Sequence, residues 1–266
     1  SNIPENRTPD MLAIVSPAKK IDSSDLERVM PHTNAVFSEE TQELVGAARK
    51  LSRPKIKNLM KLSDNLVELN YHRYQDFAPK MTKANAKQAV MTFAGDTYVG
   101  LEAKSLNDDE LEYAQGHLRI LSGLYGVLRP FDLIQPYRLE MKIRLKTKKA
   151  ADLYDFWGNR IGDLLEKEVA KHPSPVLINL ASIEYFKAVQ PKSRLTRIIT
   201  PIFKEEKDGV AKVIGFSAKQ ARGSMARYMI TNRIENPDDL KSFDTGGYMY
   251  QAHASNDDEW VFIRKS

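Results

Sequence analysis

Met11–Val15 is a run of five consecutive apolar residues that ends at Ser16-Pro17, and it constrains the fold more than any other segment. An unbroken apolar run of this length is typical of a buried strand, because a strand with one face in water alternates apolar and polar residues. Val176–Leu180 is also predominantly apolar, with Asn179 as its one polar residue. We therefore expect a chain with buried strands, and its 266 residues are enough for a large core.

Helical signals lie between these two runs and after the second. Residues suited to a first turn predict helix starts at Ser38, Pro54, Ser63 and Asn107. The last of these is the clearest, because Glu110 follows Asn107 by three residues and can complete a capping box. Its apolar spacing continues to Leu121, so we expect this helix to end at Gly123. Amphipathic spacing predicts further helices over residues 152–171 and 218–234.

Additional strands are predicted over residues 91–99, 198–203, 210–216 and 260–263. Asp208-Gly209 lies between two of them, which predicts an antiparallel hairpin. Because the strands are scattered irregularly among the helices, we expect an α+β fold rather than a doubly wound sheet. We expect one mixed α/β domain over residues 11–266, with the polar segment Ser1–Asp10 as a lead-in.

Several functional classes are disfavoured by what the sequence lacks. There is no cysteine, which excludes disulfides, thiolate metal sites and cysteine nucleophiles. The five histidines are dispersed, and no phosphate-binding loop, dinucleotide fingerprint or zinc-protease motif is present. We expect no catalytic residues, no metal site and no cofactor. No run of apolar residues is long enough to span a membrane, and we expect a cytoplasmic protein.

The basic residues are segregated along the chain. Lys and Arg number 40 against 35 Asp and Glu, a net charge of +5. Residues 49–61 and 138–149 carry six basic residues each, and residues 187–197 and 219–233 carry four each. Such segregation favours a polyanionic partner, although a solvated basic surface explains it equally well.

The turn Ser122-Gly123-Leu124-Tyr125-Gly126 is the strongest local signal. Two helices joined by a glycine hairpin form the helix-hairpin-helix element of non-specific DNA-binding proteins, in which backbone amides contact phosphate oxygens. The match is imperfect, because two residues separate the glycines and Pro130 shortens any second helix. The alternative is a glycine that ends the helix, with Leu124 and Tyr125 packed in the core.

Other segments contain candidate anion-binding groups. Lys19 and Lys20 follow the first strand, and Lys219 and Arg222 share a helix that carries no acidic residue. The alternatives are solvated lysines and an ordinary amphipathic helix. Ser182 can begin a helix directly after a buried strand and expose backbone amides to an anion, as many ordinary helix starts do.

Six strings of the sequence resemble one family of bacterial proteins, the YaaA peroxide-stress family. They are SPAKK at 16–20, GDTYVGL at 95–101, HLRILSGLYGVLRPFDLIQPYRLEM at 117–141, DLYDFWG at 152–158, INLAS at 178–182 and AKQARG at 218–223. The resemblance extends from Met11 nearly to the C-terminus. It implies a cytosolic protein made during hydrogen peroxide stress that binds DNA and lowers unincorporated iron. It also implies a single α/β domain of unusual topology with a basic cleft and a helix-hairpin-helix element.

Transferred to this sequence, the resemblance implies a set of DNA-binding residues. They are Gly123, Leu124, Tyr125 and Gly126 in the hairpin, Arg129, Tyr137 and Arg138 beside it, and Lys19, Lys20, Lys219 and Arg222 in the cleft. We expect the partner to be double-stranded or structured DNA contacted through its phosphates, and we expect a monomer.

Two other functions remain open at the level of sequence. The first is an enzyme acting on a nucleotide, a nucleobase or damaged DNA, with Asp96, Tyr98, Glu140 and Lys19 in the same cleft. Because Glu140 lies between Arg138 and Lys142, a structural ion pair is the alternative role for its carboxylate. The second is direct iron sequestration, which needs clustered oxygen and nitrogen ligands.

Overall fold

A mainly parallel sheet runs through the protein in the computed structural model, which describes residues 11–170 and 175–266. The predicted lead-in Ser1–Asp10 lies outside the described residues. The strand order is β11-β12-β9-β8-β1-β5-β6, and β10 pairs with β9. The strands are β1 (Met11–Val15), β5 (Leu118–Ser122), β6 (Gly126–Leu128), β8 (Val176–Leu180), β9 (Arg197–Lys207), β10 (Val210–Lys212), β11 (Met249–Tyr250) and β12 (Glu259–Lys265).

The five consecutive strands β5, β1, β8, β9 and β12 are parallel to one another, whereas β6, β10 and β11 pair antiparallel at the margins. The expected mixed α/β fold in a single domain is confirmed. The expected α+β class, in which antiparallel pairing predominates, was the wrong emphasis. The hairpin at Asp208-Gly209 that favoured it pairs only the marginal strand β10 with β9. Two short pairs lie outside this sheet, β2 (Lys20–Ile21) with β4 (Phe93–Ala94) and β3 (Lys87–Gln88) with β7 (Leu133–Ile134).

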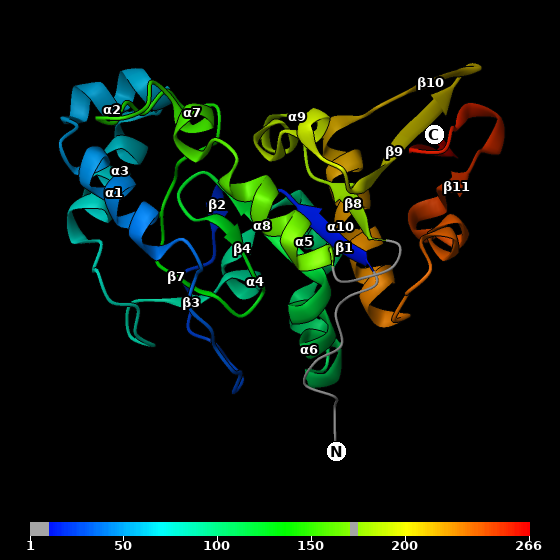
Figure 1. The fold of residues 1–266 in the computed structure, drawn as a ribbon, viewed down its shortest axis with the longest axis horizontal. Helices are drawn as coiled ribbons and strands as arrows, with labels where there is room; N and C mark the ends of the chain where they lie inside the picture. Colours follow the sequence, from blue (N-terminus) through cyan, green and yellow to red (C-terminus); the bar gives the residue numbers. More distant parts are fainter. Residues whose placement is uncertain (1–10, 171–174) are drawn as a thin grey trace.

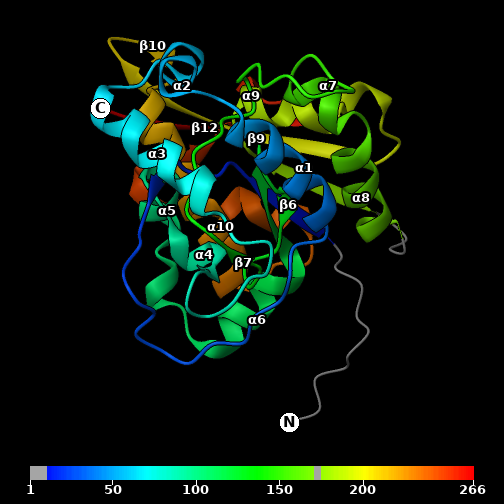
Figure 2. The same cartoon turned by 90° about the vertical axis from the view of Figure 1, so that its left-hand side faces the viewer.

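Helices cover both faces of the sheet. In Figures 1 and 2, α8 lies on one face, and α5, α6 and α10 lie on the other. All residues of β1, β5 and β8 are buried, as expected for parallel strands covered from both sides. The helices are α1 (Ser38–Arg49), α2 (Arg53–Met60), α3 (Asp64–Asp76), α4 (Ala89–Thr92), α5 (Asp96–Leu101), α6 (Asp108–His117), α7 (Leu153–Trp157), α8 (Arg160–Val169), α9 (Ile183–Phe186) and α10 (Gly215–Thr231). Short 3₁₀ turns cover Ala103–Ser105, Lys187–Val189, Pro191–Ser193, Pro237–Ser242, Thr245–Gly247 and Ala252–Ala254.

The capping signals in the sequence located helix starts better than helix ends. Asn107 and Glu110 form the predicted capping box, and the Ser63 side chain accepts the Leu66 amide. The predicted helix over residues 152–171 is split, because Gly158 has a positive φ of 51° between α7 and α8. Residues 91–99 were expected to form a strand but contain the end of α4, the two residues of β4 and the start of α5.

The predicted helix-hairpin-helix element was wrong. α6 ends at His117, and the next five residues form the buried strand β5. The glycine turn joins β5 to β6, with Ser122 opposite Gly126 in an antiparallel pair. Leu118 and Leu121 also fit the apolar face of a helix, so periodicity alone assigned them to the wrong element.

α5 and α10 contact each other through their backbones. A Cβ at Gly223 would lie 1.7 Å from the carbonyl oxygen of Thr97, and a Cβ at Gly100 would lie 2.0 Å from the carbonyl oxygen of Gln220. Only glycine permits such an approach. The two glycines therefore set the distance between α5 and the helix that carries Lys219 and Arg222.

Gly223→Ala is expected to destabilise the protein by roughly 1–3 kcal/mol, because the added methyl group must separate two packed backbones. Gly116→Ala is the matched control, since Gly116 also lies in a helix and a Cβ there would have no heavy atom outside its own helix turn within 4 Å. The control should leave stability unchanged or raise it by about 0.5–1 kcal/mol. Urea denaturation of both variants tests this account, and equal stability of Gly223→Ala and wild type would contradict it.

Candidate functional site

A cleft opens where β1 and β8 end, and we call it the β1–β8 cleft. Its volume is about 650 Å³. Its lining comes from five separate parts of the chain: Ser16–Lys20, residues 94–97, residues 137–140 with Lys142, Ser182–Tyr185, and Gly215 with Lys219 and Arg222. Because the carboxyl ends of parallel strands meet at one edge of a sheet, β1 and β8 bring the first and fourth of these together.

Two serines connect the loops that leave β1 and β8. The Ser182 amide donates to Ser16 Oγ at 2.8 Å, and the two hydroxyl oxygens are 3.2 Å apart. The Tyr98 hydroxyl donates to the Ser16 carbonyl at 2.8 Å. Ser182 does not cap α9 through its side chain. These hydrogen bonds fix the loop that carries Lys19 and Lys20.

Basic side chains outnumber acidic ones in the lining. The basic residues are Lys19, Lys20, Arg138, Lys142, Lys219 and Arg222, and the acidic residues are Asp96, Glu140 and Glu184. Lys19 and Arg138 both approach Glu140 Oε1, at 3.7 and 3.4 Å. Within residues 11–170 and 175–266, the side chains of Lys20, Lys142, Lys219 and Arg222 form no ion pair or hydrogen bond. These unpaired cationic groups of the cleft are therefore available to bind an anion.

Three charged groups of the lining are wholly or partly withdrawn from solvent. The Glu140 side chain is 7% exposed, and its Oε2 atom has no hydrogen-bond partner among the described residues. Arg138 Nε is likewise buried without a partner there. Burial lowers the pKa of Arg222, which is half-buried, because the charged guanidinium loses hydration. Such groups are costly to bury unless something complements them.

Buried tyrosines support the wall beside Glu140. Tyr137 lines the cleft, and its hydroxyl lies 2.6 Å from Ser122 Oγ. The Tyr74 hydroxyl donates to the Arg138 carbonyl. Burial raises the pKa of Tyr137, Tyr98 and Tyr185 far above the usual value, because ionisation would place a charge in an apolar environment. These phenols are thus neutral hydrogen-bonding groups.

Comparison with known proteins identifies relatives along nearly the whole chain. A family model described as peroxide stress protein YaaA matches residues 11–254. The chain belongs to the YaaA family. It is 50% identical over 258 residues to UPF0246 proteins of Burkholderia mallei (strain SAVP1) and Burkholderia pseudomallei (strain K96243), a match covering 96% of this chain and 99% of each relative. A UPF0246 protein of Paraburkholderia phytofirmans (strain PsJN) is 49% identical over 257 residues, with the same coverage.

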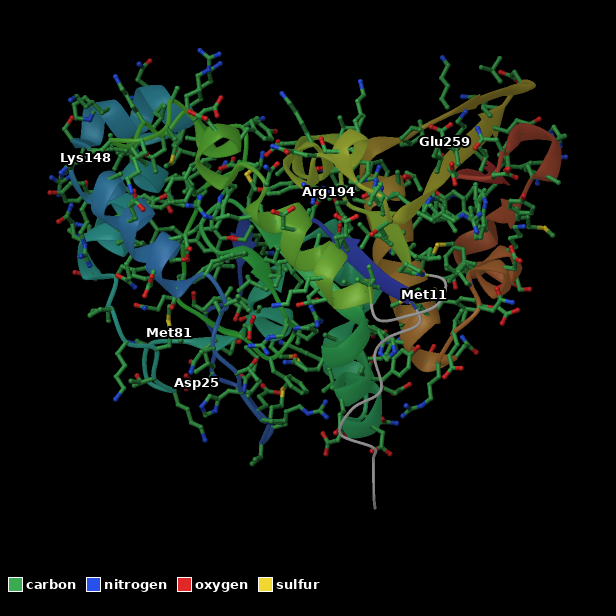
Figure 3. The ribbon with its side chains drawn as sticks, viewed as in Figure 1. Met11, Asp25, Met81, Lys148, Arg194 and Glu259 are labelled. Carbon is green, nitrogen blue, oxygen red and sulfur yellow. The ribbon has the colours of Figure 1, made fainter. Side chains whose placement is uncertain are left out.

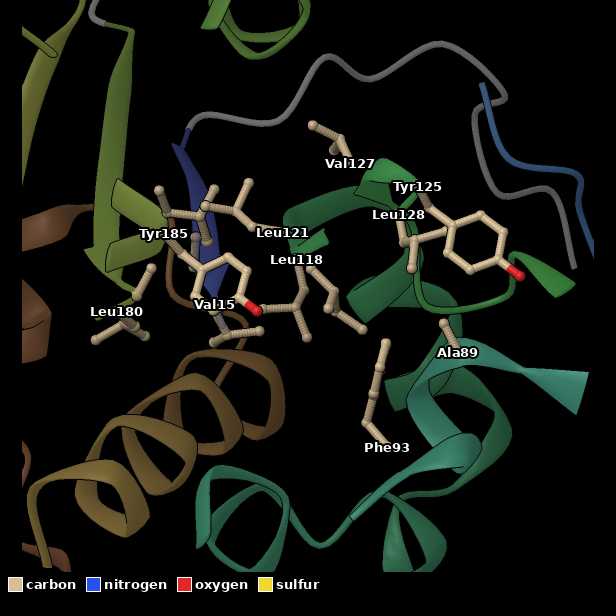
Figure 4. Close-up of a cluster of buried hydrophobic side chains, with 14 of the residues drawn as sticks. Val15, Ala89, Phe93, Leu118, Leu121, Tyr125, Val127, Leu128, Leu180 and Tyr185 are labelled. Carbon is tan, nitrogen blue, oxygen red and sulfur yellow. The ribbon is translucent and has the colours of Figure 1, made fainter. Parts of the chain in front are cut away.

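The glycine turn of this YaaA-family chain lies in the core. Leu124 and Tyr125 are buried, and Figure 4 shows Tyr125 among other apolar side chains close to Leu128. A Cβ at Gly123 would lie 2.2 Å from the Leu139 carbonyl oxygen, and Gly126 packs against Trp157. The turn therefore has no surface free for phosphate. It instead packs against the Leu139–Glu140 backbone. The alternative interpretation of this turn correctly placed Leu124 and Tyr125 in the core.

The other predicted DNA-binding residues divide into two groups. Lys19, Lys20, Tyr137, Arg138, Lys219 and Arg222 all line the β1–β8 cleft. Arg129 does not, because it pairs with the buried Asp132 at 2.9 Å and donates to the Asn34 carbonyl. The basic segment 138–149 is also divided, since Lys148 lies on an outer surface of the molecule (Figure 3).

A second cavity, of about 510 Å³, lies between residues 22–30 and 83–88. Most of its charged lining residues have partners: Lys104 approaches Asp22 at 3.2 Å, and Lys87 donates to the carbonyl oxygens of Asp22 and Ser24. Arg28 pairs with Asp108 at 2.5 Å. This cavity therefore presents less unpaired charge than the β1–β8 cleft.

Two structural properties of the described residues concern metal binding and membranes. In the described ranges, no three Asp, Glu or His side chains are arranged so that they could hold a metal ion. None of the helices in those ranges is both long enough and apolar enough to cross a lipid bilayer.

Folding stability is expected to fall as the pH rises above about 10, where tyrosines of the unfolded chain ionise. The folded-state pKa values are raised, so the stabilisation is complete below this pH and is lost as the pH approaches them. Tyr137→Phe should reduce the steepness of this loss by about 1.4 kcal/mol per pH unit. Urea denaturation between pH 8 and 11 measures it. A variant with the wild-type pH dependence would show that Tyr137 ionises freely in the folded state.

Proposed function

We propose that this protein acts in the peroxide-stress response by binding the DNA phosphate backbone in the β1–β8 cleft, and so helps to limit unincorporated iron. The observation that carries the proposal is the convergence of unpaired cations from three separate segments. Lys20 lies in the segment after β1, and Lys142 lies two residues after Glu140. Lys219 and Arg222 are both on α10. The family description supports the stress role.

Phosphate binding accounts for this arrangement better than a structural role does. A cation in a structural ion pair faces its carboxylate, as Arg129 faces Asp132. Four cations of the cleft lack such a partner among the described residues. Each cation that neutralises a DNA phosphate releases condensed counterions, which favours binding irrespective of base sequence. The interaction is therefore expected to be largely independent of sequence.

The dimensions of the cleft restrict the contact. A volume of about 650 Å³ matches a single small ligand and is far too small for a duplex. The backbone of one strand would thus reach into the cleft while the rest of the duplex remains outside. This favours DNA whose strands can separate locally.

Replacing three cations of the cleft, in Lys20→Gln/Lys219→Gln/Arg222→Gln, should weaken DNA binding and flatten its salt dependence. The slope of log K against log salt should decrease by about three, one for each phosphate contact removed. Fluorescence anisotropy with a labelled duplex at about 50 to 200 mM salt measures both quantities.

The matched control is Lys167→Gln/Lys192→Gln/Lys265→Gln, which removes the same charge from exposed lysines outside the cleft. An equal loss of affinity in both triple variants would contradict the proposed location. The same proteins test the iron effect in peroxide-stressed cells that lack the native gene. Wild type and control should lower unincorporated iron, whereas the cleft variant should not.

A further inference from the structure

The β1–β8 cleft lies where the sheet reverses its order. From β1 the sheet continues to β5 on one side, and from β8 it continues to β9 on the other. The loops that leave β1 and β8 therefore diverge, and open α/β sheets bind their small ligands in the crevice formed at such a switch point. The sheet topology thus predicts a ligand at this position, independently of the charges in the lining.

One acceptor atom in the wall of the cleft, Glu140 Oε2, receives no hydrogen bond from the described residues. Glu140 is buried, its Oε1 atom is shared between Lys19 and Arg138, and its Oε2 atom has no partner among the described residues. A buried carboxylate oxygen is strongly destabilising when it accepts no hydrogen bond. A ligand that presents an N–H or O–H group to this atom would remove the penalty.

Two cations on another side of the cleft, Arg222 and Lys219, have no anionic partner among the described residues. Arg222 is half-buried and has no ion pair or hydrogen bond within the described ranges, and Lys219 lies on the same helix three residues earlier. Burial of the unpaired guanidinium is unfavourable, so an anionic group beside it would stabilise the site. Arginine suits phosphate because its planar group can donate two parallel hydrogen bonds.

Apolar surface is present at the same cleft. Ile183 lines it and is 90% exposed, and Phe216, which is 65% exposed, follows the lining residue Gly215. Proteins use exposed aromatic and aliphatic side chains of this kind to contact nucleobases.

We propose that the cleft holds one nucleotide unit, with its phosphate at Lys219 and Arg222 and an N–H group of its base donating to Glu140 Oε2. This deepens the proposed DNA binding and rests on it in part. The nucleotide is either free or displaced from a DNA strand, since both sources present the same phosphate and base. Glu140 is then a base-recognition residue, whereas the cations serve any phosphate.

Glu140→Gln separates this inference from simple phosphate binding, because its effects on the two ligands have opposite signs. The substitution preserves the shape of the side chain but removes a negative charge from the cleft. It should weaken binding of 2′-deoxyguanosine 5′-monophosphate at least tenfold, while affinity for inorganic phosphate, which has no base, increases because a negative charge is lost. Arg222→Gln should weaken both. Glu43→Gln, an exposed acid on α1 outside the cleft, should change neither.

Isothermal titration measures the mononucleotide, with deoxyribose 5-phosphate and inorganic phosphate as probes that lack the base. The expected result is tighter binding of the complete nucleotide than of either probe. Equal binding of all three, or wild-type nucleotide affinity in folded Glu140→Gln, would overturn the inference. A duplex that fails to bind wild type would instead refute the proposed function, whatever the mononucleotide does.

A duplex with one 2-aminopurine distinguishes the two sources. A rise in its fluorescence on binding wild type, absent with Glu140→Gln, supports a nucleotide displaced from the strand. Binding of the mononucleotide without that rise supports a free nucleotide.

Discussion

The parallel pairing of β1 with β5 and β8 is the constraint on which the rest of the structure depends. Hydrogen bonds connect β1 to a neighbour on each side, and all five of its residues are buried. Such a strand forms only when helices cover both faces of the sheet, as α8 and α10 do (Figures 1 and 2). The pairing also brings Ser16 and Ser182 to one edge, where their hydrogen bonds join the two loops. The cleft is therefore a consequence of the sheet order.

Close backbone contacts then set the shape of the cleft. Gly123 allows the β5–β6 turn to touch the Leu139 carbonyl, and Gly223 allows α10 to touch α5. The first contact supports the wall that carries Glu140, and the second positions the helix that carries Lys219 and Arg222. The glycine turn thus contributes to the site through packing and not through contact with phosphate.

The sequence predicted the buried strands and several helix starts, because an unbroken apolar run and a capping pair are local signals. It misplaced the end of α6, since Leu118 and Leu121 fit a helix face as well as a buried strand. Most of the basic residues of the cleft were singled out as candidates, but Arg129 and the glycine turn, which were predicted with them, are not part of the cleft. The burial of Asp132, which pairs with Arg129, and the burial of Tyr125 depend on tertiary contacts that no local pattern reveals. The same holds for the unpartnered oxygen of Glu140, because burial decides its importance.

Amide hydrogen–deuterium exchange with and without a DNA duplex tests the central claim, that the β1–β8 cleft is the surface contacting DNA, most directly. We expect DNA to slow exchange in three segments: Ser16–Lys20, Ser182–Tyr185 and the first turns of α10. The buried turn at Gly123–Gly126 should be little affected, because it already exchanges only through unfolding. Slower exchange confined to α1, α2 and α3, with the three cleft segments unchanged, would contradict the account.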